Sequence, residues 1–308
     1  MIRTLRLVCL LALTSPLIAQ QPAHPAPASA SARPAITGVA FAAYYTTDPT
    51  AAQKFYSKTL GFARIEDGSV WRYPVNRSQW IEIITTPPPH PNDRYASIGF
   101  TTRDAAQLER YLRARGVTID SPLKDGRFAV HDPEGDRIVF VQAGSQKDVA
   151  AAPPSPNATS QRIIHAGVIT HDLAKESAFW QDILGFHPYW RGGHNDTSVD
   201  WVMYQVPSGS DWIELMLNPA PSPTLQQAGV MYHLSLGEYT IQDAITMLAR
   251  NGCEGAACSK TLTGRDGKVQ LTQFDPDHTR VEFMEFKPVQ TPCCTPVTGE
   301  TPTMDEDQ

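Results

Sequence analysis

Short stretches of the chain alternate between apolar and polar residues with a period of two, which predicts β-strands. In residues 212–217, for example, Ile213 and Leu215 share one face and Glu214 lies on the other. Pro, Gly and Ser residues bound these stretches. The predicted strands include residues 70–73, 80–84 and 97–101 early in the chain, and residues 163–169, 201–206, 212–217, 232–236 and 281–286 later.

Helices are predicted between these strands. Two of them start at Asp48 and Asp172, residues that favour the N-cap position, and end at Gly61 and Gly185. Each such helix follows a strand and precedes several more strands, so the order of elements is strand, helix, strand, strand, strand.

Two further helices are predicted over residues 104–115 and 240–250. Gly116 and Gly252 follow them, at the position where the backbone past a helix end often turns left-handed. Thr240 with Asp243 predicts a capping box at the second of these helices. The strand–helix–strand–strand–strand order therefore occurs twice in each half of the chain.

The two halves repeat one another in sequence. FYSKTLGF at residues 55–62 reappears as FWQDILGF at 179–186, and QWIEI at 79–83 reappears as DWIEL at 211–215. HDPE with DRIVF, within 131–140, reappears as FDPD with TRVEF, within 274–283. Matched blocks in the same order indicate a duplication. The expected organisation is a half at 36–143, an Ala/Pro/Ser-rich linker at 144–160, a half at 161–288 and a tail at 289–308.

These blocks resemble the vicinal oxygen chelate superfamily, which includes glyoxalase I, methylmalonyl-CoA epimerase, extradiol dioxygenases, and fosfomycin and bleomycin resistance proteins. The resemblance covers nearly all of residues 36–288. It implies an α+β fold of tandem glyoxalase-like domains, in which two βαβββ units per domain form a cupped mixed sheet with helices on its outer face. The matched motifs are specific for the superfamily and not for one reaction.

Strand alternation places two imidazoles and two carboxylates on one side of the second half. His165 lies opposite Ile164, Ala166 and Val168, and the other three polar residues lie opposite apolar neighbours in the same way. Because helices must cover the apolar face, the polar side chains are expected on the concave face. The four are His165, Glu214, His233 and Glu282.

These residues predict a metal site, because buried carboxylates without a partner are costly. Two glutamates and two neutral histidines give a net neutral site for one divalent metal, namely Zn, Ni, Co, Mn or Fe. The same sequence separation lies between His165 and Glu214 as between His233 and Glu282, which matches the internal repeat. The pattern also resembles the His, Glu or Gln, His, Glu ligands of the glyoxalase I and epimerase branch.

The first half departs from this pattern. Alignment on the shared blocks places Phe41, Glu82, Ser97 and Val139 at the four ligand positions. Since only Glu82 is a metal-binding residue type in the expected set, this half is predicted to be a structural partner without a metal. Both halves are expected to pair within one chain.

Two enzyme reactions and one binding role fit the predicted site. The first is an isomerase or lyase that moves a proton on a small oxygen-chelating substrate, with Glu282 and then Glu214 as the candidate base. The second is an Fe(II) extradiol dioxygenase, which by resemblance uses two histidines and one glutamate. The third is a small-molecule binding or resistance protein without a metal.

Several other residues are candidates around the site. The loop at 191–198 is expected to shape the pocket, whereas four histidines without strand placement are expected in loops. Candidate pocket walls are Tyr204, Trp212, Met216, Met284 and Arg191, and the loop histidines are His171, His187, His194 and His278, of which His187 and His194 are candidates to reach a substrate.

The N-terminal residues predict export to the periplasm or outside the cell. Residues 1–19 combine Arg3 and Arg6 with an apolar run and small residues, as a secretory signal does. Residues 20–35 are a low-complexity leader. The net charge of −6 forms no basic stripe, which argues against a nucleic-acid partner, and no membrane partner is expected after signal cleavage.

The cysteines beyond the signal predict two disulfides, because an even number in an exported chain favours pairing. The expected role is to tie the tail to the loop after Gly252. The pairing remains open among three possibilities, and a zinc site of four thiolates is the alternative. The cysteines are Cys253, Cys258, Cys293 and Cys294, and the acidic residues 300–308 are expected to be solvated.

Overall fold

The computed structural model describes residues 32–90 and 92–304. The expected export signal at 1–19 and most of the expected leader at 20–35 lie outside these residues. In the described part of the chain, no helix has the length and apolar character needed to cross a membrane.

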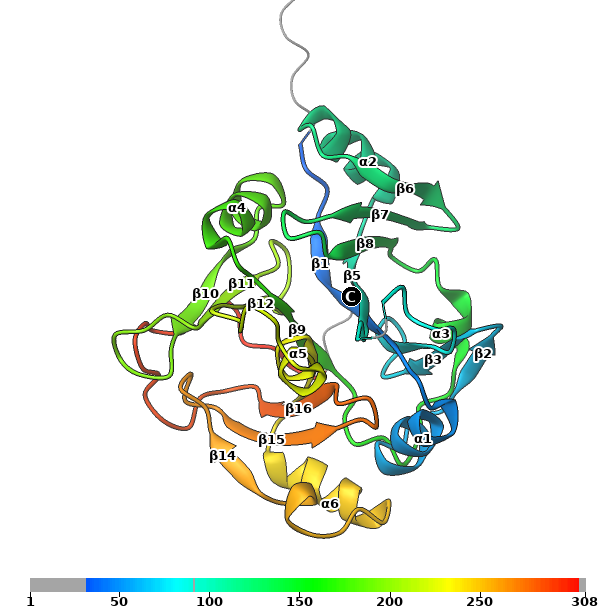
Figure 1. The fold of residues 1–308 in the computed structure, drawn as a ribbon. Helices are drawn as coiled ribbons and strands as arrows, with labels where there is room; N and C mark the ends of the chain where they lie inside the picture. The colour runs from blue at the N-terminus through cyan, green and yellow to red at the C-terminus, as the bar shows by residue number, and fades with distance from the viewer. Residues whose placement is uncertain (1–31, 91, 305–308) are drawn as a thin grey trace, which may run out of the picture. The chain divides into compact units, whose positions relative to one another are not determined.

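The first half holds two βαβββ units in one eight-stranded sheet (Figure 1). Its strand order is β2-β3-β4-β1-β5-β8-β7-β6, with β1 parallel to β4 and antiparallel to β5. The elements are β1 (Ile36–Tyr45), α1 (Pro49–Gln53), the π-helical turn η1 (Lys54–Thr59), β2 (Ile65–Asp67), β3 (Val70–Pro74), β4 (Trp80–Ile84), β5 (Tyr95–Thr102), α2 (Ala105–Ala114), β6 (Ile119–Lys124), β7 (Arg127–His131) and β8 (Arg137–Gln142).

The second half repeats this topology in the order β10-β11-β12-β9-β13-β16-β15-β14. The predicted α+β fold with a mixed sheet in each half is confirmed. The elements are α3 (Lys147–Ala151) between the halves, then β9 (Ile163–Ile169), α4 (Leu173–Ser177), the π-helical turn η2 (Ala178–Ile183), β10 (His187–Gly192), β11 (Trp201–Gln205), β12 (Trp212–Met216), α5 (Leu225–Met231), β13 (His233–Glu238), α6 (Ile241–Arg250), the 3-10 turn η3 (Ala256–Cys258), β14 (Thr261–Thr263), β15 (Val269–Phe274) and β16 (Arg280–Glu285).

The helix caps follow the sequence except at α6. Asp48 and Asp172 accept hydrogen bonds from backbone N–H groups of the first turn, as predicted. The predicted capping box at Thr240 and Asp243 was wrong, because Thr240 makes no side-chain hydrogen bond to the backbone of the helix. Its hydroxyl donates instead to the Asp243 carboxylate at 3.0 Å, and Glu285 accepts from the first N–H of the helix. A capping box is present instead at α5, a helix that the pattern did not predict.

The apolar faces of the two sheets meet in one core that both halves share. Its buried residues come from strands and helices of each half. Phe100 of β5 packs edge-on against Trp180 of η2 at 5.6 Å and against Phe186 at 5.3 Å between ring centroids. The halves therefore pair within the chain through this shared core, and each half also has a smaller buried apolar cluster of its own.

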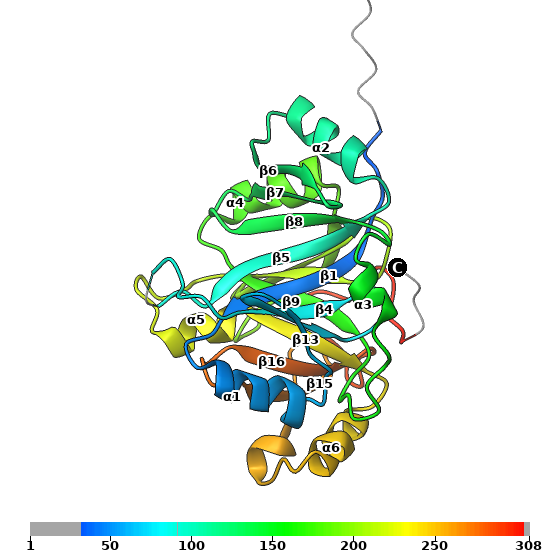
Figure 2. The same cartoon turned by 90° about the vertical axis from the view of Figure 1, so that its right-hand side faces the viewer.

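The repeated Asp-Pro-acid motif connects the halves. After β15, the Asp277 carboxylate accepts from the Thr46 hydroxyl at 2.6 Å and from the Thr47 N–H at 3.1 Å, just before α1. Figure 2 shows α1 beside β15 and β16. In the equivalent contact of the other half, Glu134 accepts from the N–H groups of His171 and Asp172, at 2.8 and 2.7 Å, just before α4. Each motif thus anchors the first helix of the opposite half.

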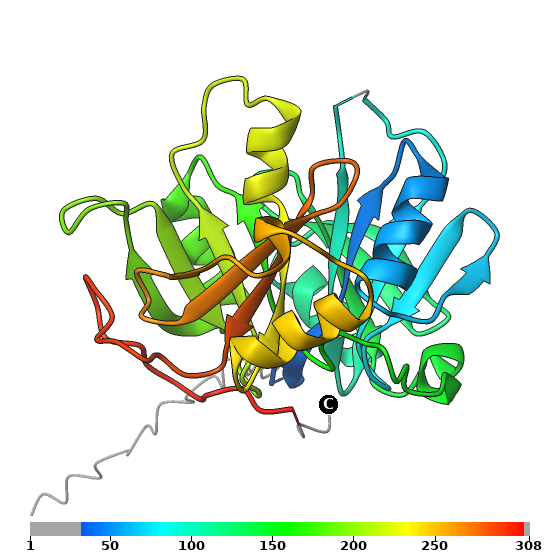
Figure 3. The ribbon, with the colours of Figure 1, turned by 90° about the horizontal axis from the view of Figure 1, so that it is seen from below.

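The described part of the C-terminal tail packs along β10 and β11, and within the stretch expected to be solvated Glu300 is exposed whereas Pro302 is buried. Thr298 donates to the carbonyl oxygen of Tyr189 at 2.9 Å, and Glu300 exchanges hydrogen bonds with Gln205. Figure 3 shows this segment, coloured red, passing these strands. Because β10 is an edge strand of the sheet, the backbone of the tail finds a hydrogen-bond partner there. Residues 305–308 lie outside the described part.

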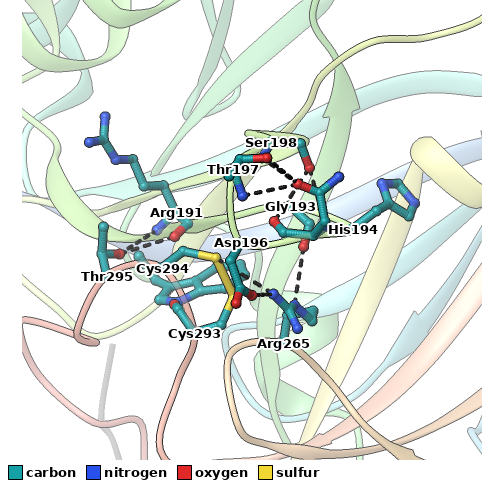
Figure 4. Close-up of a disulfide and its surroundings, with 12 residues drawn as sticks. Arg191, Gly193, His194, Asp196, Thr197, Ser198, Arg265, Cys293, Cys294 and Thr295 are labelled. Carbon is teal, nitrogen blue, oxygen red and sulfur yellow. Dashed lines mark hydrogen bonds and ion pairs between the residues drawn. A yellow bond between two sulfur atoms is a disulfide. The ribbon is translucent and has the colours of Figure 1, made fainter.

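The two disulfides are local, so the expectation that they tie the tail to the loop after Gly252 was wrong. Cys253 bonds Cys258 around η3, and Cys293 bonds the adjacent Cys294 in the tail. Side-chain and backbone hydrogen bonds hold the tail instead. Figure 4 shows the second disulfide near the loop at 191–198, where Arg265 contacts Asp196 and donates to the Gly193 carbonyl oxygen.

A group of buried acids lies where the first-half motif meets α4. Glu176 accepts from the Trp180 indole N–H at 2.7 Å and from the Glu134 N–H at 3.1 Å. Burial, then the charge of Asp132, raises the pKa of Glu176 to about 8. Burial, then the charge of Asp136, raises the pKa of Asp132 to about 8. Both folded-state pKa values exceed those of an unfolded chain, so folding favours the protonated acids.

Stability should therefore fall as pH rises from about 4, the pKa of an unfolded carboxyl group, through about 8. Glu176→Gln mimics the protonated acid and should lose less stability over this range, by at least about 1 kcal/mol at pH 8. Urea unfolding at pH 5 and pH 8 measures the difference. Asp182→Asn, an exposed position on η2, is the control and should keep the wild-type slope. An unchanged slope in Glu176→Gln would contradict the assignment.

Candidate metal centre

The four residues predicted as metal ligands project from the four central strands of the second sheet. β9, β12, β13 and β16 are neighbours in the order β12-β9-β13-β16. Their side chains are almost fully buried, with exposed fractions between 0% and 7%. The residues are His165 on β9, Glu214 on β12, His233 on β13 and Glu282 on β16.

The donor atoms of these residues converge. Nε2 of His165 lies 3.1 Å from Nε2 of His233 and 3.4 Å from a carboxylate oxygen of Glu282. An oxygen of Glu214 lies 3.1 Å from Nε2 of His233 and 3.5 Å from Nε2 of His165. The ligand atoms of His165, His233 and Glu282 all lie within 4.8 Å of one another. The four side chains thus meet at one point, as the alternation of residues along the strands predicted.

Protonation states suit metal binding. The Nδ1 N–H of His233 donates to the carbonyl oxygen of Met231 at 3.0 Å, which leaves the Nε2 lone pair directed at the centre. Burial, then the charge of Arg280, lowers the pKa of His233, so the imidazole is neutral at pH 7. Burial acts to raise the pKa of Glu214, but the adjacent imidazoles of His165 and His233 bring it below its usual value. Neutral imidazoles and an ionised carboxylate are the forms that ligate a divalent cation.

Glu282 and Arg280 also show whether the centre suits a divalent cation. Oε2 of Glu282 is buried and has no hydrogen-bond partner among the described residues, and such an atom is costly without a compensating charge. The Arg280 guanidinium donates to Nε2 of His233 at 2.7 Å. Its side chain is 17% exposed, the most open at the centre. The donor set therefore fits a divalent cation that takes the place of the guanidinium at the His233 lone pair.

A glycine provides the space for one imidazole. Gly167 on β9 pairs with His233 across the sheet, and a Cβ atom at this position would overlap the His233 ring. In the first half, Ala43 and Ser97 form the equivalent pair. The glycine is therefore needed where the histidine is present, a signal that the sequence contained but that strand phase alone did not reveal.

Trp212 orients the other imidazole. Its ring stacks on His165 with centroids 4.9 Å apart, and Tyr189 stacks on Trp212 at 4.8 Å. The buried ammonium of Lys268 lies 4.3 Å from the Trp212 ring centroid and donates to the Tyr189 hydroxyl at 3.1 Å. Sequence reasoning proposed Trp212 as a pocket wall but missed Tyr189 and Lys268, because their segments are distant in sequence.

Tyr204 and Arg191, which were expected to line the pocket, and Ile164, which was expected on the other face of β9, lie elsewhere. Tyr204 donates to or accepts from the Ser177 hydroxyl at 2.7 Å and lines, with Arg191, a separate cavity of about 510 Å³ beside the tail. Ile164 was expected opposite His165, but it clusters with Trp212 and Met284. A register shift between β9 and β13 next to His165 explains the difference, because an extra residue reverses the alternation there.

Comparison with protein families decides the classification. The model of the Glyoxalase/Bleomycin resistance protein/Dioxygenase superfamily matches residues 38–140 and again residues 162–283. The chain belongs to this superfamily. Among curated protein sequences, none matches the chain.

Solved structures with a similar fold include ring-cleaving dioxygenases. Homoprotocatechuate 2,3-dioxygenase from Brevibacterium fuscum aligns with a TM-score of 0.61 at 17% identity, covering 82% of this chain and 72% of that one. A complex of that enzyme with 3,4-dihydroxyphenylacetate aligns at 0.58 and 17%, covering 82% and 81%. The Arthrobacter globiformis enzyme aligns at 0.57 and 16%, covering 83% and 82%. At these identities the likeness concerns the fold.

The first half keeps the superfamily sheet but fills the equivalent positions differently. Strand register places Phe41, Glu82, Ser97 and Val139 where the second half has its four polar residues, as the sequence alignment predicted. Glu82 accepts from Arg127 at 2.6 Å and from the Trp80 indole N–H at 2.8 Å. An ion pair thus neutralises this carboxylate without a metal.

The remaining histidines lie away from the centre. His171 pairs with Glu134 at 2.9 Å, and His194 pairs with Asp200 at 2.9 Å. His278 is in the turn before β16 with φ of 69°. His187 was expected in a loop, but it is the first residue of β10 and its Nδ1 bonds the Gln205 carbonyl oxygen.

Gly167→Ala tests the packing of the centre. The new methyl group should displace the His233 imidazole and weaken divalent-metal binding by about tenfold or more, since misplacing one ligand removes its metal bond. Titration with Zn²⁺ in a calorimeter measures the effect. The matched control is Ala43→Gly in the first half, which should leave Zn²⁺ affinity unchanged. Equal affinity in Gly167→Ala and wild type would show that His233 is not a ligand.

Proposed function

We propose that the chain is a metal-dependent enzyme that acts on a small molecule with two neighbouring oxygens. The observation that carries this proposal is the convergence of two imidazoles and two carboxylates in one buried place, where Oε2 of Glu282 has no hydrogen bond from the described residues. One divalent cation, held by His165, Glu214, His233 and Glu282, would act as a Lewis acid on the substrate oxygens. Zn, Ni, Co, Mn and Fe all suit such ligands.

Each side chain around the proposed metal has its own role in this reaction. Glu282 has a carboxylate oxygen without a hydrogen bond, so Oε2 is the better candidate to accept a substrate proton. Glu214 is second, because both histidines already engage its oxygen. The rigid stack of Trp212 on His165 keeps the imidazole oriented. Arg280, on the most exposed side of the centre, is placed to pair with a substrate oxyanion as the substrate enters.

Proton transfer of the isomerase or lyase type is the reaction that we favour. It uses a base beside the substrate, and the site offers two carboxylates for that role. The burial of the donors, at most 7% exposed, would keep water away from the proton transfer. This choice depends on Glu214 being a ligand together with the other three residues.

Extradiol ring cleavage is the second candidate. His165, His233 and Glu282 form a compact set of two histidines and one carboxylate, the pattern typical of non-haem Fe(II) oxygenases. The fold neighbours are named 2,3-dioxygenases, and one is in complex with 3,4-dihydroxyphenylacetate, a catechol. If Glu214 does not coordinate the metal, coordination positions stay open for a catechol and oxygen.

We also propose that the protein is exported. The signal-like residues 1–19 support this, together with the two disulfides, which are typical of an oxidising compartment. Mass spectrometry of the mature protein from its native host would show removal of the signal, and a retained Met1 in the cytosol would contradict export.

Elemental analysis of protein purified without chelators tests the metal directly. We expect about one divalent metal per chain in wild type and a large loss in His165→Ala, because one of the few protein bonds to the metal disappears. Glu82→Gln, at the equivalent first-half position of Glu214, is the control and should retain the metal. Metal-free wild type would favour a binding protein over an enzyme, and loss of metal in Glu82→Gln would place the metal in the first half.

Glu214→Ala separates the two reactions. A four-ligand proton-transfer enzyme should lose metal affinity and activity on a hydroxyketone substrate by tenfold or more, since both depend on that carboxylate. A three-ligand dioxygenase should keep Fe²⁺ and keep consuming oxygen with catechol. Oxygen uptake and Fe²⁺ content, measured on the same preparation, give the answer. Glu238→Ala, a buried acid on β13 outside the donor set, controls for loss of folding.

A further inference from the structure

The two halves contain the same pair of residues on the same strand. Glu82 follows Trp80 by two positions on β4, as Glu214 follows Trp212 on β12. Strand β4 pairs with β1 so that Glu82 lies opposite Ala43, and β12 pairs with β9 so that Glu214 lies opposite Gly167. The two tryptophan–glutamate pairs therefore occupy equivalent places in equivalent sheets.

The tryptophan rings also have the same orientation. Trp80 stacks on Phe41 with centroids 5.0 Å apart and an angle of 22° between planes. Trp212 stacks on His165 at 4.9 Å and 25°. The position of the indole is thus a property of the fold and does not depend on whether the neighbouring ring is a metal-binding one.

The carboxylates, in contrast, point to different partners. In the first half the indole N–H of Trp80 donates to Glu82 at 2.8 Å. In the second half the oxygen of Glu214 lies against His165 and His233. The indole nitrogen of Trp212 is buried and finds no hydrogen-bond partner in the described part of the chain. A buried N–H without a partner is costly, so an acceptor within reach would stabilise it.

The neighbours of the two carboxylates differ. Arg127 donates to Glu82 at 2.6 Å, so the first-half carboxylate is held beside the Trp80 indole. In the second half the Lys268 ammonium lies over the Trp212 ring, and the Glu214 carboxylate lies against the histidine pair. The first half therefore shows that a glutamate in this backbone reaches the indole N–H.

We propose that the Trp212 indole N–H is a second binding position for the Glu214 carboxylate. Glu214 contacts the histidine pair in one position and accepts from Trp212 in the other. The inference rests on the proposed function, in which Glu214 is a metal ligand. Moving to Trp212 releases one coordination position, so a substrate that chelates through two oxygens drives the exchange by needing that position. Trp212 is then a positioning residue that acts through Glu214.

The test uses the whole zinc-loaded protein and acetohydroxamate, a small ligand with two adjacent oxygens. Trp212→Phe keeps an aromatic ring on His165 but removes the N–H. Zn²⁺ affinity should stay within a few-fold of wild type, whereas acetohydroxamate binding should weaken about tenfold, the value of one hydrogen bond to a charged group. Trp80→Phe removes the equivalent N–H from Glu82 and should change neither affinity. Calorimetry measures both.

Proton–nitrogen NMR of the indole groups supplies a readout on the wild-type protein itself. The chain has six tryptophans, and the signal lost in Trp212→Phe identifies the relevant N–H. In zinc-loaded wild type this signal should move downfield when acetohydroxamate is added, as the N–H gains an acceptor. The signal of Trp80 should not move.

The outcomes separate the two proposals. If wild type binds no Zn²⁺, the metal centre and the inference both fail. If wild type binds Zn²⁺ but the Trp212 signal and the acetohydroxamate affinity of Trp212→Phe stay unchanged, only the inference is overturned. If Trp212→Phe loses Zn²⁺ affinity as strongly as acetohydroxamate affinity, and the wild-type signal does not move, Trp212 serves only to hold His165 and the inference is again wrong.

Discussion

Charge compensation at one buried point is the constraint on which the second half depends. Two carboxylates and two imidazoles reach the same point from β9, β12, β13 and β16. Such a group is stable only if a cation is shared among its members or if protons are redistributed. Arg280 supplies a positive charge at its exposed side, but an oxygen of Glu282 keeps no hydrogen bond. The arrangement is the one expected if a small divalent cation binds at this point.

The duplicated half shows what the same sheet does without that requirement. Phe41 stacks on Trp80 where His165 stacks on Trp212, and Arg127 neutralises Glu82 where the histidines contact Glu214. The backbone, the register and the tryptophan are kept. What differs is the sign and placement of charge around one carboxylate. The first half contributes to the shared core and anchors α4 through Glu134, so its role in the structure does not need a metal.

The fold and the candidate site could be predicted largely from the sequence because both depend on local periodicity and on repetition. Alternation placed Glu214 opposite Ile213 and Leu215, and the repeat placed Phe41 at the position of His165, as register confirms. Ile164 was misplaced because a shift in strand pairing is set by contacts with another strand. Whether these four residues bind a metal remains a prediction.

Features that depend on distant contacts could not be predicted. The tail composition did not indicate that its backbone hydrogen-bonds with Tyr189 on the edge strand β10 and with the Gln205 side chain. The spacing of the cysteines left three pairings open, and the structure pairs Cys293 with its direct neighbour Cys294. Lys268 and Tyr189 reach Trp212 from separate segments, so no spacing rule pointed to them.

X-ray absorption spectroscopy of the metal-loaded protein tests the central claim most directly. We predict a first shell of nitrogen and oxygen only, with the outer-shell scattering of two imidazoles at metal–nitrogen distances of about 2.0–2.1 Å. The outer-shell signal should decrease by one imidazole in His233→Ala. Sulfur in the first shell, or an absence of imidazole scattering, would place the metal elsewhere and contradict the account.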